Sequence, residues 1–240
     1  MQKRVAYITG GTKGIGLAIA QALLDNDINV IFTGRTNDSV NQAQNTLDQG
    51  RAKGEAAAAG FAADVRDLAA QEKAIAAGTE QFGQAPSIVV ANAGVGHFAP
   101  IQDLSPEQWQ QTIDINLTGV YNTIKASLNG LIEQEGYFFT IASLAGTNFF
   151  AGGSAYNASK FGLVGFTQAV MLDLRQQGVK VSTIMPGSVA TEFNNRTVSP
   201  ADKWKIQSED IAQIVVDLLK MPARTLPSKV EVRPSMPPIK

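Results

Sequence analysis

The residues with the clearest chemical potential are Tyr156 and Lys160, which lie four positions apart in Tyr156-Asn157-Ala158-Ser159-Lys160. On a helix, residues with this spacing share a face, so the lysine ammonium can approach the tyrosine side chain. A free tyrosine has a pKa of ~10, and a nearby cation stabilises the phenolate and lowers that value. The pair predicts proton transfer by Tyr156 near neutral pH. Alone, the same spacing is also typical of an exposed helical pair, so other motifs must decide.

A glycine-rich loop supplies a second feature, at Thr9-Gly10-Gly11-Thr12-Lys13-Gly14-Ile15-Gly16. The loop follows a strand-like run and enters an apolar helix-like stretch. Glycines let the backbone approach a pyrophosphate closely, and a helix N-terminus adds positive potential for that anion. The loop therefore predicts dinucleotide binding, although an ordinary tight turn would use the same residue type.

The end of the second strand-like run predicts which dinucleotide binds. An acidic residue there would favour NAD(H), but the sequence reads Thr33-Gly34-Arg35-Thr36. Arg35 can clamp a ribose 2′-phosphate through charge-assisted hydrogen bonds, and Lys13 adds a second positive charge. The sequence thus favours NADP(H), with NAD(H) as the less favoured cofactor. The alternative interpretation is that both side chains are solvated surface charges.

These motifs need a scaffold, and the order of elements provides it. Short β-branched runs at 5–9, 29–33, 87–91, 137–141 and 180–184 alternate with helix-like stretches at 15–26, 68–82, 106–134 and 154–177. A weak edge strand near 60–63 and a last strand at 229–232 bring the number to about seven. This order predicts an α/β, doubly wound Rossmann-type parallel sheet with helices on both faces, in a single domain spanning 1–240. We expect a short substrate lid near 192–207.

Five motifs together resemble the short-chain dehydrogenase/reductase family, in its compact single-domain branch. The glycine loop is similar to its Thr-Gly-x-x-x-Gly-x-Gly signature, and Asn92-Ala93-Gly94 to its Asn-Asn-Ala-Gly motif, with Ala91 replacing the first Asn. Asn116, Ser143, Tyr156 and Lys160 follow the order of its Asn-Ser-Tyr-Lys tetrad. Another departure is Ala142, where many members have a serine.

The resemblance implies a role for each matching residue. Tyr156 would act as general acid or base, Ser143 would hydrogen-bond the carbonyl oxygen, and Lys160 would bind the nicotinamide ribose and lower the Tyr156 pKa. Asn116 would hold a water through its side chain or backbone. The implied cofactor-binding residues are Gly10, Thr12, Lys13, Gly14, Ile15, Gly16, Arg35, Thr36, Asp64, Val65, Asn92, Ala93, Gly94, Tyr156, Lys160, Pro186, Gly187, Val189 and Thr191.

The implied activity is NADP(H)-dependent hydride transfer between a nicotinamide and a ketone, aldehyde or secondary alcohol. One alternative is a catalytically idle NADPH-binding regulator. Another is a 3-oxoacyl reductase acting on carrier-protein or CoA substrates, although the C-terminus lacks the Gly-Gly ending common in that group. The resemblance also implies a homo-oligomer, either a dimer or a tetramer.

Composition narrows the remaining classes. The 240 residues have a formal net charge of −1 and no basic block, which argues against nucleic-acid binding. The absence of cysteine and the single histidine, His97, argue against a metal site. No segment approaches the ~20 apolar residues of a membrane span, and we expect a cytoplasmic protein with a small-molecule substrate.

Overall fold

In the computed structural model, which describes residues 3–50 and 56–238, one parallel sheet of seven strands has the order β3-β2-β1-β4-β5-β6-β7. The strands are β1 Val5–Thr9, β2 Asn29–Gly34, β3 Ala58–Ala62, β4 Ile88–Ala91, β5 Tyr137–Ile141, β6 Lys180–Pro186 and β7 Lys229–Val232. The order reverses between β1 and β4, because the chain first builds outward to β3 and then returns beside β1. In open sheets of this kind, ligands bind where such a reversal occurs.

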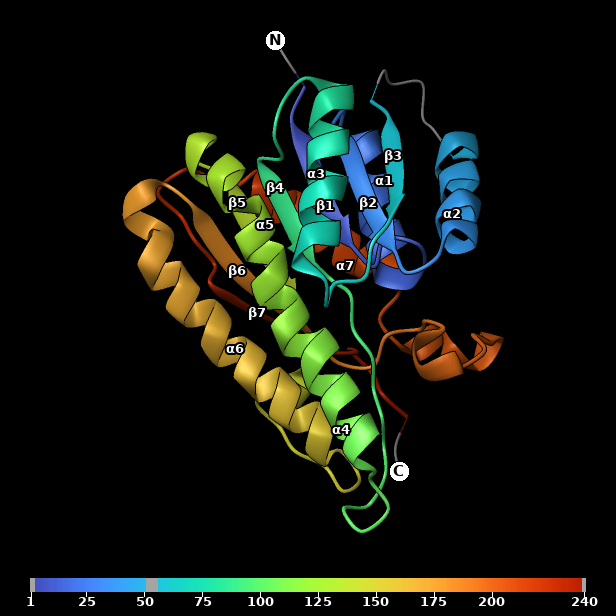
Figure 1. Cartoon of the computed structure of the whole chain (residues 1–240). Helices are drawn as coiled ribbons and strands as arrows, with labels where there is room; N and C mark the ends of the chain where they lie inside the picture. The colour runs from blue at the N-terminus through green and yellow to red at the C-terminus, as the bar shows by residue number, and fades with distance from the viewer. Residues whose placement is uncertain (1–2, 51–55, 239–240) are drawn as a thin grey trace.

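Helices cover both faces of the sheet (Figure 1). They are α1 Gly14–Asp25, α2 Asn37–Gln49, α3 Leu68–Phe82, α4 Pro106–Ile113, α5 Gly119–Glu133, α6 Ser154–Leu174 and α7 Ser208–Leu219. Helices α3, α5 and α6 lie in front of the sheet in Figure 1, and α1 and α7 lie behind it, packed against each other. The predicted doubly wound fold is confirmed.

Strand β1 shows how the sheet divides the core. Its side chains point alternately to opposite faces, so Val5 and Tyr7 pack with α3, α5 and α6, whereas Ala6 and Ile8 pack with α1 and α7. All four side chains are fully buried. Burial on both faces explains why the strand is a continuous apolar run without polar alternation.

A buried polar cluster ties the sheet to the loop that follows β3. The amide oxygen of Gln71 accepts hydrogen bonds from the Tyr7 hydroxyl (3.2 Å) and the Thr123 hydroxyl (2.9 Å). Its amide nitrogen donates to the backbone oxygen of Val65 (2.8 Å), and Asn122 donates to the same oxygen (3.0 Å). Buried polar groups that are satisfied in this way hold a loop in one conformation.

Two sequence expectations need refinement. The weak strand expected at 60–63 begins earlier, at Ala58, and it lies at the sheet edge as expected. The helix expected over 106–134 is interrupted by a π-helical turn at Asp114–Thr118. A π turn inserts without changing the apolar pattern of its surroundings, so periodicity alone does not reveal it. None of the helices in the described part of the chain is long and apolar enough to cross a membrane.

Candidate active site

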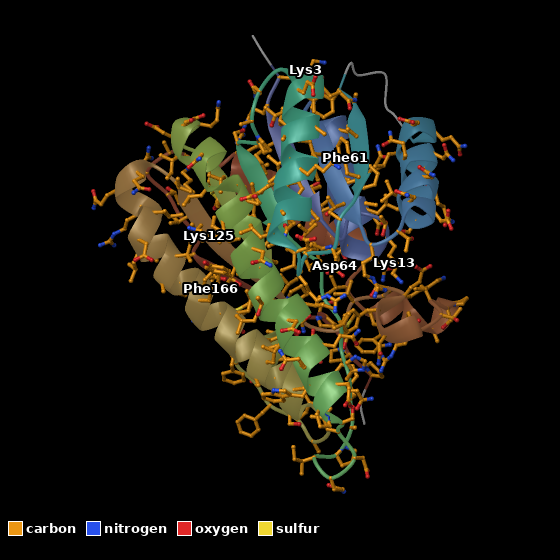
Figure 2. All side chains as sticks on the ribbon, in the orientation of Figure 1. Lys3, Lys13, Phe61, Asp64, Lys125 and Phe166 are labelled. Atoms are coloured by element: carbon orange, nitrogen blue, oxygen red, sulfur yellow. The ribbon has the colours of Figure 1, made fainter. Side chains whose placement is uncertain are left out.

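Most of the predicted site residues gather at the carboxyl end of the sheet. Figure 2 shows Lys13 and Asp64 at this end, Lys13 in the loop after β1 and Asp64 in the segment after β3. Asn92 follows β4 and Ser143 follows β5. Parallel strands all end at one edge, so four segments distant in sequence reach the same region.

The glycine loop after β1 has a shape that only glycine allows. Gly10 and Gly14 have positive φ angles of 64° and 54°. A Cβ at Gly16 would lie 2.3 Å from the Gly10 carbonyl oxygen and 2.5 Å from the Asn92 amide nitrogen. The backbone therefore folds closely on itself and leaves its outer side free of side chains.

The N-terminus of α1, which this loop enters, has no side-chain cap and no acidic residue in its first turn. By contrast, Thr36, Asp67 and Ser105 cap α2, α3 and α4. The first N–H groups of a helix have no partner within the helix and carry partial positive charge. This donor set fits a pyrophosphate, as the sequence predicted for Gly14, Ile15 and Gly16.

Thr9 and Asn92 lock the loop to the end of β4. The Thr9 hydroxyl accepts from the backbone N–H groups of Asn92 (3.2 Å) and Ala93 (3.3 Å). The Asn92 amide donates to the carbonyls of Thr9 (3.1 Å) and Gly10 (3.0 Å). Asn92 therefore shapes the loop through its side chain, a role that the sequence motif did not specify.

Arg35 and Lys13 are exposed, as binding of a phosphate requires. Thr12 reaches the same region, because a Cβ at Gly34 would lie 2.3 Å from its methyl carbon. The Asp64 carboxylate forms an ion pair with the Arg66 guanidinium (2.6 Å). The hydrogen bond from Arg66 lowers the pKa of Asp64, and Arg35 contributes to this shift through space. Asp64 is therefore ionised and neutralised by Arg66.

Tyr156 and Lys160 lie one turn apart on α6, as predicted, with the Lys160 Nζ 5.7 Å from the centre of the Tyr156 ring. Burial lowers the pKa of Lys160 to about 8, and its ammonium donates to the Ile141 carbonyl (3.0 Å). The expected lowering of the Tyr156 pKa does not appear. Burial raises the pKa of the phenol, and the hydrogen bond with Ser143 opposes that rise.

Asn116 is fully buried in the π-helical turn, and its amide pairs with the backbone of Val95. The Val95 N–H donates to the Asn116 Oδ1 (2.8 Å), and the Asn116 Nδ2 donates to the Val95 carbonyl (2.9 Å). The same Nδ2 donates to the Ser159 hydroxyl (3.0 Å). Both donors and the acceptor of this amide are therefore engaged within the protein. A Cβ at Gly94 would lie 3.3 Å from Oδ1, so Gly94 lies beside this cluster.

The segment 186–191 lies against both Ser143 and the glycine loop. The Ser143 hydroxyl donates to the Pro186 carbonyl (3.4 Å), and the Gly187 N–H donates to the Val232 carbonyl (2.8 Å). Val189 forms a parallel bridge with Ile206. Thr191 approaches Gly14, where an added Cβ would lie 3.4 Å from its methyl carbon. The segment expected to meet the nicotinamide thus adjoins the predicted pyrophosphate loop.

Two positioning residues escaped the sequence analysis although both lie inside the Tyr156–Lys160 motif. The Asn157 amide donates to the carbonyls of Ala145 (2.8 Å) and Asn148 (2.8 Å), which fastens the loop after Ser143 to α6. The Ser159 hydroxyl donates to the Tyr156 carbonyl (2.8 Å) while accepting from Asn116. Their burial was the missing information, because polar residues near a helix start are more often exposed.

Comparisons with known proteins agree with this arrangement. Residues 4–202 match the family model described as short chain dehydrogenase. An uncharacterized oxidoreductase of Staphylococcus aureus (strain MRSA252) is 32% identical over 232 residues, which are 96% of this chain and 97% of that protein.

Two solved structures are similar over nearly the whole chain. An alcohol dehydrogenase from the archaeon Thermococcus sibiricus, complexed with 5-hydroxy-NADP, has a TM-score of 0.89 and 28% identity, covering 99% of this chain and 100% of that one. A metagenomic short-chain oxidoreductase in complex with NADP has a TM-score of 0.82 and 31% identity, covering 97% and 98%. This chain therefore belongs to the short-chain dehydrogenase family of oxidoreductases.

Proposed function

We propose that this oxidoreductase interconverts ketones or aldehydes and the corresponding alcohols with NADP(H), using Asn116, Ser143, Tyr156 and Lys160 as its catalytic residues. The observation that carries the proposal is the position of Tyr156. Its ring lies above the buried Lys160 ammonium, and its phenol interacts with Ser143. The segment 186–191 continues from Ser143 toward the glycine loop.

The choice of NADP(H) rests on two supports. Lys13 and Arg35 are exposed at the end of the sheet where the adenosine ribose would lie, and Arg66 neutralises the one nearby carboxylate, Asp64. Both similar structures reported above hold NADP or a derivative of it. Thr36 and Val65 would complete the adenosine side, with Val65 fixed by Gln71 and Asn122.

For carbonyl reduction, each side chain has one task. When bound, the nicotinamide supplies the hydride to the carbonyl carbon. Ser143 donates a hydrogen bond to the carbonyl oxygen, and Tyr156 transfers its proton to that oxygen, giving the alcohol. Lys160 holds the nicotinamide ribose and, as a cation, stabilises the phenolate that remains. Oxidation of the alcohol follows the same steps in reverse.

The proton lost by Tyr156 must return from solvent, and Asn116 would position the water that delivers it. Val95 and Ser159 engage the whole Asn116 amide, so the backbone of Asn116 is the part that we assign to this water. Residues 192–207 would act as the substrate lid. The bridge between Val189 and Ile206 closes the base of this segment, which contains two short 3₁₀ turns.

The test is NADPH oxidation at 340 nm with a panel of neutral ketones and aldehydes, repeated with NADH. We expect turnover with NADPH and a lower kcat/KM with NADH. Tight NADPH binding without turnover of any carbonyl compound would instead support a regulator that senses the cofactor.

A further inference from the structure

We infer that the substrate is a neutral carbonyl compound bearing an aromatic or alicyclic ring, bound against an aromatic wall formed by Phe98, Phe150 and Phe193. This inference rests on the proposed function and adds the substrate class. The three residues come from separate segments, the loop after β4, the loop before α6 and the segment after β6. They converge beside Tyr156, the residue proposed to protonate the substrate.

The geometry of the rings leaves room for a ligand. The Phe98 ring lies 5.3 Å from the Tyr156 ring at 69°, and the Phe193 ring lies 6.0 Å from it at 55°. Phe150 extends the wall, with its ring 5.9 Å from that of Phe98 at 51°. Rings that meet at such angles do not stack shut, and Phe98 and Phe150 remain 41% and 48% exposed. A ring-bearing ligand that covers these surfaces would gain hydrophobic and edge-to-face contacts.

Two glycines seat the rings close to the backbone. A Cβ at Gly96 would lie 2.8 Å from the Phe98 ring and 3.0 Å from the Phe193 ring. A Cβ at Gly153 would lie 2.5 Å from the Phe150 ring. Both glycines are buried. The rings therefore lie flat against the main chain, and any larger residue at either position would push them toward the ligand space.

The charge around the wall favours a neutral ligand. Residues 92–102 and 143–159, which carry Phe98 and Phe150, contain no Asp, Glu, Lys or Arg. The nearby ammonium of Lys160 is buried and donates to the Ile141 carbonyl. A substrate carboxylate next to the reacting carbonyl would therefore lose its hydration without gaining a matched cation. This argues against 3-oxo acids and for a ketone whose polar group is the carbonyl alone.

The experiment compares kcat/KM with NADPH for three probes, acetophenone, 2-butanone and acetoacetate. We expect acetophenone to exceed both others by about 10-fold or more. Phe98→Ala and Phe193→Ala should each lower the acetophenone value by about 10-fold while leaving acetoacetate within about twofold. Gly96→Ala should act in the same direction by displacing the rings. The matched control is Phe149→Ala, since Phe149 is 87% exposed and should leave all three values unchanged.

A binding measurement separates this inference from the proposed function. Calorimetric titration of acetophenone into the protein with NADP⁺ should give a Kd that rises about 10-fold in Phe98→Ala. Such binding without turnover of any probe would refute the proposed reaction and keep the aromatic wall. Turnover that prefers acetoacetate, or phenylalanine variants that lower all three probes equally, would overturn the aromatic wall and keep the reaction. Unchanged melting temperatures would show that the variants are folded.

Discussion

The Lys160 ammonium lies 5.7 Å from the centre of the Tyr156 ring while donating its hydrogen bond to the Ile141 carbonyl. This contact holds a cation beside the phenol in a place where water has little access, since Lys160 is only 4% exposed. Burial acts on the two residues in opposite directions, lowering the pKa of Lys160 and raising that of Tyr156. In both cases it favours the neutral form.

The first prediction concerns stability and pH. Because the pKa of Lys160 falls from 10.5 to about 8 in the folded state, the folded protein binds fewer protons than the unfolded chain between these values. The free energy of unfolding should therefore gain a contribution from Lys160 that rises with pH above 8, by up to about 1 kcal/mol per pH unit. Denaturant unfolding between pH 8 and 9.5 should show a steeper slope for the parent than for Lys160→Met. Equal slopes would contradict it.

The second prediction is that Tyr156→Phe abolishes most of the activity without loss of cofactor binding. The variant lacks the only atom proposed to carry the proton, so kcat should fall by a factor on the order of 10²–10⁴. NADPH affinity, followed by fluorescence titration, should change by less than about threefold. A variant that reduces its best ketone at the parent rate would rule out Tyr156 as the acid.

The third prediction uses the two glycines whose surroundings differ most. Gly16→Ala places a Cβ 2.3 Å from the Gly10 carbonyl and should cost about 1–3 kcal/mol of stability and weaken NADPH binding. Gly165 in α6 is exposed and has nothing within 4 Å of an added Cβ. Gly165→Ala should therefore stabilise the protein by about 0.5–1 kcal/mol. Thermal unfolding and NADPH titration of both variants check the contrast.

The fourth prediction concerns cofactor choice. Removing the exposed Arg35 by Arg35→Ser should weaken NADPH binding by about 10-fold or more, because a charge-assisted hydrogen bond is worth about 1.5–3 kcal/mol. NADH binding, which lacks the 2′-phosphate, should change little. The control is Arg224→Ser, which removes an exposed arginine in the segment after α7. If Arg35→Ser weakened both cofactors equally, the assignment of the 2′-phosphate to Arg35 would fail.

The fifth prediction concerns association of two or more copies. Large apolar side chains are exposed on the outer surfaces of α4, α5 and α6, namely Trp109, Tyr121, Phe161 and Leu172. We propose that these surfaces meet in a homo-oligomer, since burying them would be favourable. Light scattering should give a mass that is a multiple of 25.5 kDa. Tyr121→Glu together with Leu172→Glu should shift it toward the monomer, whereas a monomeric parent protein would refute the proposal.

Much of the scaffold could be predicted from the sequence because its signals are local. Strands buried on both faces appear as short apolar runs, and a glycine loop between a strand and a helix has few other uses. The structure accordingly places Tyr156 and Lys160 on one helix, with Ser143 after β5. The ends of β3 were less certain because alanine and glycine dominate Ala58–Ala62.

The remaining features depend on long-range packing. Phe98 and Phe193 meet at Tyr156 although no local motif links them. The direction of the Tyr156 pKa shift follows from burial, which the Tyr-x-x-x-Lys spacing cannot report. Asn157 and Ser159 act through bonds to the backbone of other segments, so their residue types alone gave no indication of those contacts.

The pairing of Asn116 with Val95 has a consequence for how the specificity of this chain can change. The Asn116 amide grips only main-chain atoms of Val95, so the anchor does not depend on which side chains the following residues carry. Natural variation or protein engineering can exchange the residues at 97 and 98 without loosening the loop. Selection for new substrates can therefore act on this short stretch while the proton-transfer apparatus stays intact.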